Sequence, residues 1–311
     1  MSSELRHIHA ETLLDLAREH QDLRVLEADL MGSVSTGKFQ AEFPEQFIQC
    51  GIAEANMIGV AAGLSATGLV PFVHSFGCFI TRRCYDQLFL SGGYARQHIN
   101  IFGSDAGVAA VTNGGTHMPF EDVGLMRLIP NSVVIEVSDA AVLKKAMHFS
   151  YQTPGVNYIR STRKDLPDLY KSPDDIEIGK GQVLREGDDL TIVASGLSVH
   201  DALKSATEIE ALMGKTVTVV DMHTIKPLDT QLVIQCINRT GKLLTVENHN
   251  VTGGLGDAVI AELLEAGVAP TAFRKLGVRE QFGQVGSLDY LKDQYGISAQ
   301  AITEAAIAML D

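Results

Sequence analysis

Short apolar stretches rich in β-branched residues alternate with longer helical stretches along most of the chain. This alternation is typical of a mostly parallel sheet covered by helices. In the first half, the expected strands are 23–28, 70–73, 99–102, 133–136 and 156–159. The expected helices between them are 9–18, 52–64, 82–90 and 140–151. The pattern therefore predicts an α/β fold.

A polar, proline-containing stretch at 163–180 interrupts the alternation, as a linker between domains does. The pattern then restarts, with expected strands at 190–194, 217–221 and 242–246. The expected helices of this part are 199–213, 230–238, 257–265 and 298–310. We therefore expect two domains, 1–168 and 169–311, each a mostly parallel sheet covered by helices.

Composition narrows the class of protein. The 25 Lys and Arg residues against 38 Asp and Glu residues give a net charge of -13 with no basic cluster, which disfavours binding to nucleic acid. The N-terminal stretch lacks the basic-then-apolar order of a signal peptide, and the apolar run at 51–64 is too short to span a membrane. The 4 cysteines are scattered without CxxC spacing, which predicts buried thiols in a reducing cytoplasm.

Glu54 is the most unusual residue, because the stretch around it, GIAEANMIGVAAGL, is otherwise almost entirely apolar. A buried carboxylate needs a partner. One interpretation places Glu54 in the first turn of a helix, where free N–H groups and the helix dipole stabilise it. The other is a buried acid that shares a proton with a heterocyclic nitrogen. The two interpretations are compatible.

Two further segments contain candidate functional residues. The glycine-rich segment 103–119, GSDAGVAAVTNGGTHMP, follows a strand and contains His117, which either shuttles a proton or is simply solvated. In segment 71–87, Phe76 and Phe79 are typical of a core, and Arg82 and Arg83 of a solvated face or an anion site. Neither segment matches the nucleotide-binding patterns GxGxxG or Walker A.

Taken together, six motifs resemble the C-terminal part of transketolases, the thiamine-diphosphate enzymes, in the form encoded by split, two-subunit members of that family. The motifs are FPEQFIQCGIAEANMIGVAAGL, SFGCFITRRCYDQ, GGTHMPFEDVGLMRLIPN, IKPLD, VENHNVTGGLGDAV and VREQFGQVGSLDYL. The resemblance covers essentially the whole chain. It implies a pyrimidine-binding domain at 1–168, a transketolase C-terminal domain at 169–311, and transfer of a two-carbon ketol unit from a ketose to an aldose.

The resemblance also implies a role for individual residues. Glu54 would meet the pyrimidine nitrogen of thiamine diphosphate and activate the cofactor, and His117 would assist proton transfer on the substrate. The other residues expected to contact the cofactor are Asp29, Leu30, Phe76, Phe79 and Arg82. Those expected to bind substrate, together with His117, are Arg6, Ser33, Asp105, Asn113 and Arg163.

Three positions depart from the family pattern. Asn113 replaces an aspartate that reads a sugar hydroxyl, Met118 replaces a glutamine, and Asp105 replaces a histidine that helps to hold the substrate phosphate. A carboxylate at Asp105 would repel a phosphate dianion. We therefore expect a specialised sugar, still anionic, and expect restoring Gln and Asp at 118 and 113 to shift substrate preference.

The chain lacks the GDG motif and asparagine pair with which the family binds diphosphate and Mg²⁺. The resemblance therefore implies an obligate partner that carries the diphosphate-binding domain, assembled with this chain as an α₂β₂ heterotetramer. The nearest alternatives are the β subunit of a 2-oxo acid dehydrogenase E1 component and, less favoured, deoxyxylulose-phosphate synthase. A non-enzymatic scaffold is a third alternative.

Overall fold

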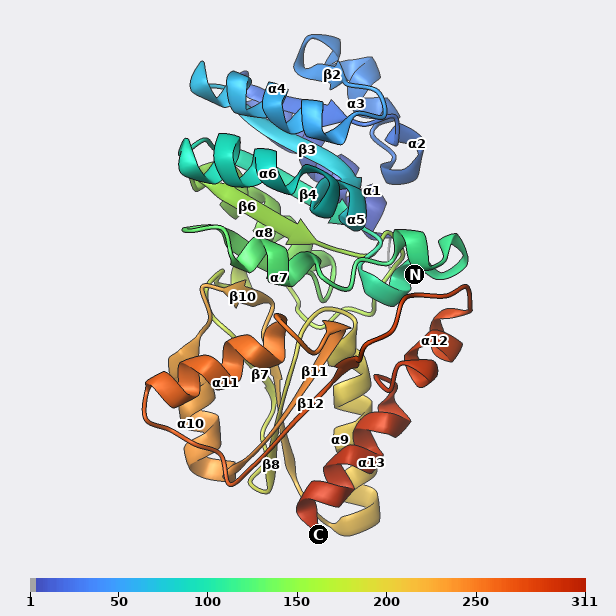
Figure 1. Ribbon diagram of the computed structural model, residues 1–311, viewed down its shortest axis with the longest axis vertical. Coiled ribbons are helices and arrows are strands. Elements are labelled where there is room, and N and C mark those ends of the chain that lie inside the picture. Colours follow the sequence, from blue (N-terminus) through green and yellow to red (C-terminus); the bar gives the residue numbers. More distant parts are fainter. Residues whose placement is uncertain (1–3) are drawn as a thin grey trace.

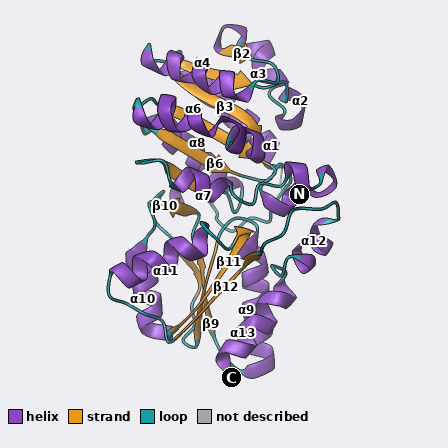
Figure 2. Ribbon diagram, in the orientation of Figure 1, coloured by secondary structure: helices purple, strands orange, loops and turns teal. Residues whose placement is uncertain are grey.

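The computed structural model describes residues 4–311, so residues 1–3 of the expected first domain lie outside the described part. It contains two helix-covered sheets stacked along the long axis of the molecule (Figure 1). The first half of the chain forms the upper layer in this view, and the second half forms most of the lower one. The predicted α/β class is confirmed, and helices flank both sheets (Figure 2).

The first sheet has seven strands, and every neighbouring pair except the one with β10 is parallel. In spatial order they are β10 (Thr224–Lys226), β5 (Val133–Glu136), β6 (Val156–Arg160), β4 (Ile99–Ser104), β3 (Val70–Phe76), β1 (Leu23–Glu27) and β2 (Phe47–Gln49). The five strands predicted for this half are all present. The short strands β2 and β10 were not predicted.

Helices cover both faces of this sheet. Helices α1 (Leu5–Glu19) and α8 (Ala140–Gln152) pack together on one face. The other face carries α4 (Glu54–Ala66), α5 (Gly77–Ile80), α6 (Tyr85–Gln87) and α7 (Asp122–Arg127). The short helices α2 (Met31–Val34) and α3 (Gly37–Glu42) follow β1.

The helix expected at 82–90 is present as a helical segment that continues to Tyr94, but its winding changes along its length. The segment is a 3₁₀ turn, Arg82–Cys84, followed by α6 and a π-helix, Leu88–Tyr94. Glycines lie at the end of this segment, and a Cβ added to Gly93 would stand 2.7 Å from Ile129 Cγ2. Gly93 therefore packs closely against the side chain of Ile129, a tertiary contact that the spacing of apolar residues does not reveal.

The second sheet has five strands, parallel except for β7. In spatial order they are β12 (Ala272–Val278), β11 (Lys242–Asn250), β8 (Leu190–Ala194), β9 (Val217–Asp221) and β7 (Gln182–Arg185). Its helices are α9 (Ser198–Met213), α10 (Thr230–Thr240), α11 (Leu255–Glu265), α12 (Leu288–Gln294) and α13 (Ala299–Leu310). The strands β7 and β12 and helix α12 were not predicted.

The two halves meet at a buried polar junction. Arg160, at the end of β6, is 0% exposed and donates to the carboxylates of Asp122 and Glu136 and to the carbonyl oxygens of Pro119 and Asn248. Strand β10 comes from the second half yet pairs with β5 of the first sheet. The halves therefore share hydrogen bonds as well as apolar contacts, and the boundary at 168/169 stays a prediction.

The cysteines are free, and three of the four are buried, with Cys50 half-buried. Burial raises the pKa values of the Cys78 and Cys84 thiols to about 12, so both are unreactive at neutral pH. Between residues 4 and 311, no helix is both long and apolar enough to cross a bilayer.

Candidate active site

The candidate site lies at the carboxyl edge of the first sheet, where ligands bind in open α/β sheets. Glu54 is the first residue of α4 and is only 2% exposed. Its Oε2 accepts from Arg83 Nη1 at 2.8 Å, and its Oε1 accepts from Ser75 Oγ at 3.4 Å. Glu54 thus has the helix-start position that one interpretation expected, but its recorded partners are side chains and not backbone N–H groups.

Aromatic rings stand beside this carboxylate. Phe76 ends β3 and Phe79 lies in α5, with their ring centroids 6.0 Å apart. The His117 ring meets both edge-on, at 5.5 Å from Phe76 and 5.1 Å from Phe79. The guanidinium carbon of Arg83 lies 4.2 Å from the Phe79 ring centroid. The structure therefore brings Glu54, both phenylalanines and His117 into one group.

The glycines of segment 103–119 allow a close contact with the second half of the chain. A Cβ on Gly115 would stand 2.1 Å from the carbonyl oxygen of Gly283. Gly107 has φ +49°, and a Cβ there would stand 2.2 Å from Asn248 Oδ1. The loop that carries His117 is thus fixed against residues that come more than a hundred positions later.

An ion pair between Asp105 and Arg163 lies close to the ring of Phe76. Asp105, which follows β4, accepts from Arg163 Nε at 2.7 Å and from Asn113 Nδ2 at 3.4 Å. The guanidinium carbon of Arg163 is 5.1 Å from the Phe76 ring centroid. Burial raises the pKa of the Asp105 carboxyl, and Arg163 opposes this shift.

The other predicted site residues lie at the margin of the group. Asp29 (φ 61°), Leu30 and Ser33 follow β1, the neighbour of β3, and the N–H of Asp29 donates to Gln49 Oε1 at 2.8 Å. Arg6 reaches Arg163 through its backbone, with N to O at 3.1 Å, while its side chain pairs with Glu4 at 2.5 Å. Their roles stay predictions.

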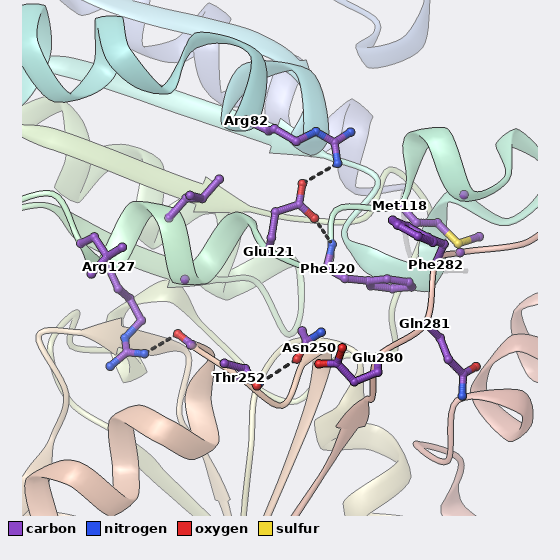
Figure 3. A pocket seen from close by; sticks show the side chains of 16 residues that line it. Arg82, Met118, Phe120, Glu121, Arg127, Asn250, Thr252, Glu280, Gln281 and Phe282 are labelled. Atoms are coloured by element: carbon purple, nitrogen blue, oxygen red, sulfur yellow. Dashed lines mark hydrogen bonds and ion pairs between the residues drawn. The ribbon is translucent and has the colours of Figure 1, made fainter.

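Arg82 pairs with a different glutamate from its neighbour Arg83. Its Nη1 donates to Glu121 Oε1 at 2.8 Å, in a cavity of about 600 Å³ between the two halves (Figure 3). Met118 lines this cavity beside the almost fully exposed Phe282. The cofactor contact of Arg82 stays a prediction, and it is the neighbouring Arg83 that contacts Glu54.

Sequence reasoning missed a buried network beneath the site. His74, in β3, lies between Glu27, with Nδ1 to Oε2 at 3.0 Å, and Ser104, with Nε2 to Oγ at 3.1 Å. Thr36 donates to the other oxygen of Glu27 at 2.8 Å. Polar residues within strands that are otherwise apolar are the signal that marks such a network. It fixes the strand ends that carry Phe76 and Asp105.

The group can therefore bind a flat heterocycle and move protons. Glu54 offers a buried carboxylate, the phenylalanines an apolar wall, and His117 a partly exposed imidazole beside them. Within residues 4–311, no group of three or more His, Cys, Asp or Glu residues is arranged to hold an ion.

Comparison with known proteins identifies the family. Residues 2–168 match the model of the transketolase pyrimidine-binding domain, and residues 179–302 match that of the transketolase C-terminal domain. The chain is 43% identical to the 6-deoxy-6-sulfo-D-fructose transketolase subunit SqwH of a Clostridium species, over 97% of this chain and 93% of that subunit. It is 33% identical to the transketolase of Rattus norvegicus, over 96% of this chain but 48% of the rat protein.

A solved structure agrees over nearly the whole length. The fold is similar to that of a split-gene transketolase described as an inactive beta4 tetramer, with TM-score 0.90, 37% identity, and coverage of 99% of this chain and 98% of that one. Transketolases are in general thiamine-diphosphate-dependent enzymes. The chain therefore belongs to the transketolase family, of which it carries the pyrimidine-binding and C-terminal domains.

Proposed function

We propose that this chain is the C-terminal subunit of a two-subunit transketolase, which transfers a two-carbon ketol unit from a ketose with an anionic end to an aldose. The observation that carries the proposal is the juxtaposition of Glu54, Phe76, Phe79 and His117 at the carboxyl edge of the first sheet. Membership of the transketolase family favours this activity over that of a 2-oxo acid dehydrogenase E1 component.

The residues present fit the pyrimidine end of thiamine diphosphate. Glu54 Oε1 has only a long contact of 3.4 Å with Ser75 Oγ, so this oxygen is available to a ring nitrogen. Phe76 and Phe79 offer an apolar wall for the ring. When bound, thiamine diphosphate supplies a carbon nucleophile and an electron sink for the transferred fragment.

The protein residues then act on protons and orientation. Glu54 holds or releases a proton at the pyrimidine nitrogen, and the aromatic wall keeps water away from it. His117 is partly exposed, with Nδ1 2.9 Å from Thr116 Oγ1, which leaves Nε2 for a substrate hydroxyl. Asp29, Leu30 and Ser33 are proposed to complete the cofactor and substrate contacts from the end of β1.

The proposal includes a partner that carries the diphosphate-binding domain and holds most of the Mg²⁺ shell, in an α₂β₂ heterotetramer. The rat relative is about twice as long as the stretch it shares with this chain. The match to 93% of the Clostridium subunit supports a split arrangement. The similar split-gene structure is an inactive tetramer of one kind of subunit.

The proposed location of the enzyme is the cytoplasm, because four free cysteines are typical of a protein in a reducing compartment.

Replacing the proton-handling carboxylate tests the proposal. In the complex reconstituted with its partner, we expect Glu54→Gln to lower kcat for ketol transfer by at least ~100-fold, the scale of acid–base catalysis. Glu45→Gln, at an exposed glutamate nearby, is the control and should keep full activity. Ketol transfer that survives Glu54→Gln at the wild-type rate would contradict the proposed role of Glu54.

A further inference from the structure

Asp105 is unusual for an aspartate in both its burial and its backbone conformation. It is 2% exposed, and its φ of 59° is in the left-handed region that non-glycine residues rarely adopt. Its side chain is held by Arg163 at 2.7 Å and by Asn113 at 3.4 Å. The carboxylate is thus fixed beside Arg163, at the end of a strand that borders the proposed site.

The contacts of Arg163 engage only part of the hydrogen-bonding capacity of its guanidinium group. Its Nε is engaged by Asp105, and its guanidinium carbon lies 5.1 Å from the ring of Phe76, which also contacts His117. Its side chain is 24% exposed, and within residues 4–311 no hydrogen bond or ion pair is formed by its Nη1 or Nη2. Two N–H donors therefore remain for an anion beside the catalytic group.

The charges around Arg163 are nearly balanced. Arg6 is next to it, with N to Arg163 O at 3.1 Å, and both Arg6 and Lys164 pair with Glu4, at 2.5 and 2.7 Å. Within these ion pairs, three cations share two carboxylates, Glu4 and Asp105, so the pairs contain one more positive than negative charge. A cluster with one uncompensated positive charge complements an anion with a single negative charge.

We propose that Asp105 determines substrate specificity by lowering the positive charge of the Arg163 cluster, so that the enzyme prefers a ketose ending in a singly charged group, such as a sulfonate, to one ending in a phosphate. This inference rests on the proposed function and names its substrate class. A phosphate monoester carries about −1.5 to −2 charges at pH 7. The additional negative charge of a phosphate is repelled by the carboxylate of Asp105. Because this carboxylate is buried, the repulsion is screened less than it would be in water.

The test compares two six-carbon ketose donors that differ only in the group at C6, a sulfonate or a phosphate, with the complex of this chain and its partner. The wild-type complex should show the higher kcat/KM with the sulfonate. Asp105→Asn keeps the hydrogen bond to Arg163 and removes the charge. We expect it to shift the kcat/KM ratio toward the phosphate by about tenfold, which corresponds to about 1.4 kcal/mol.

Two controls accompany this variant. Asp168→Asn removes an exposed carboxylate close in sequence and should leave the ratio unchanged. Glu4→Gln removes the second carboxylate of the cluster and should shift the ratio in the same direction as Asp105→Asn, by about two- to threefold because this residue is more exposed. Glu4→Gln also tests the proposal if Asp105→Asn does not fold.

The outcomes separate this inference from the function on which it rests. A wild-type complex that transfers no ketol unit from either sugar overturns the proposed function. A complex that transfers from both, with a ratio unchanged within twofold in Asp105→Asn and Glu4→Gln, overturns the role of Asp105 alone. The full-length chain by itself gives a second readout, since methanesulfonate should raise its Tm at least as much as methyl phosphate, with the order reversed in Asp105→Asn.

Discussion

Arg83 contacts both kinds of group in the proposed site. It donates to Glu54 Oε2 at 2.8 Å and lies 4.2 Å from the Phe79 ring centroid. Adjacent arginines look alike in a sequence, and only the 3₁₀ turn at Arg82–Cys84 sends one toward Glu54 and the other toward Glu121. We therefore expect the two arginines to differ in their effect on cofactor binding.

In the assembled enzyme, Arg83→Ala should raise the thiamine diphosphate concentration needed for half-maximal activity about fivefold. A half-exposed ion pair and a cation–π contact each contribute on the order of 0.5–1 kcal/mol. Arg82→Ala is the matched control and should change this concentration less than twofold. A titration in which Arg82→Ala has the larger effect would contradict this expectation and support the predicted contact of Arg82 with the cofactor.

At the scale of elements, Asp221 ties three segments together. It ends β9, and its Oδ2 accepts from Ser138 before α8 and from Tyr170 in the linker, at 2.6 and 2.8 Å. Its other oxygen is buried without a partner among residues 4–311. Burial, opposed by the bonds from Ser138 and Tyr170, raises the pKa of Asp221 to about 7.

This pKa predicts a pH-dependent effect of Asp221→Asn. Because the pKa is about 7 in the folded chain and 3.8 ordinarily, the folded state holds this proton more tightly, and wild-type stability falls as pH rises from about 4 to about 7. An asparagine side chain does not ionise, and its amide oxygen still accepts hydrogen bonds from the hydroxyl groups of Ser138 and Tyr170. The free energy of unfolding of the variant should therefore exceed that of the wild type most at pH 8, by on the order of 2 kcal/mol.

Denaturation of both chains at pH 5 and pH 8 measures this effect, with Asp168→Asn as the exposed control. If the difference between Asp221→Asn and wild type were the same at both pH values, the carboxyl would not carry the raised pKa.

Element prediction succeeded where the signal is local. The strands at 23–28, 99–102 and 190–194 are buried apolar runs, and the structure contains each of them. Strand β10 has three residues and pairs with β5 about ninety positions away, and β12 mixes charged with apolar residues. Their pairing depends on tertiary contacts, which neither periodicity nor propensity reports.

The residues of the candidate site also divide into those that a local signal in the sequence reveals and those that only tertiary contacts bring together. Glu54 stands out because a carboxylate is anomalous in an apolar helix, and His117 and Phe76 are found through motifs, so the sequence leads to the group that the structure assembles. The pairing of Asp105 with Arg163 joins β4 to the segment after β6, and no local pattern predicts it.

At the scale of the whole molecule, the proposed function makes the chain one of two subunits that form the catalytic unit. The two halves contact each other through Arg160 and through the close approach of Gly115 to Gly283. The pyrimidine end of the cofactor has candidate contacts here, whereas the diphosphate end has no metal-binding group within residues 4–311. We expect the chain to be inactive until the partner supplies that end.

The central claim is tested most directly by titrating this chain with the partner subunit recovered from its native cells, with thiamine diphosphate and Mg²⁺ present, while ketol transfer is measured. The account predicts no transfer by either subunit alone and a rate that saturates at equimolar subunits. Ketol transfer by this chain alone, or saturation at a different ratio, would contradict it.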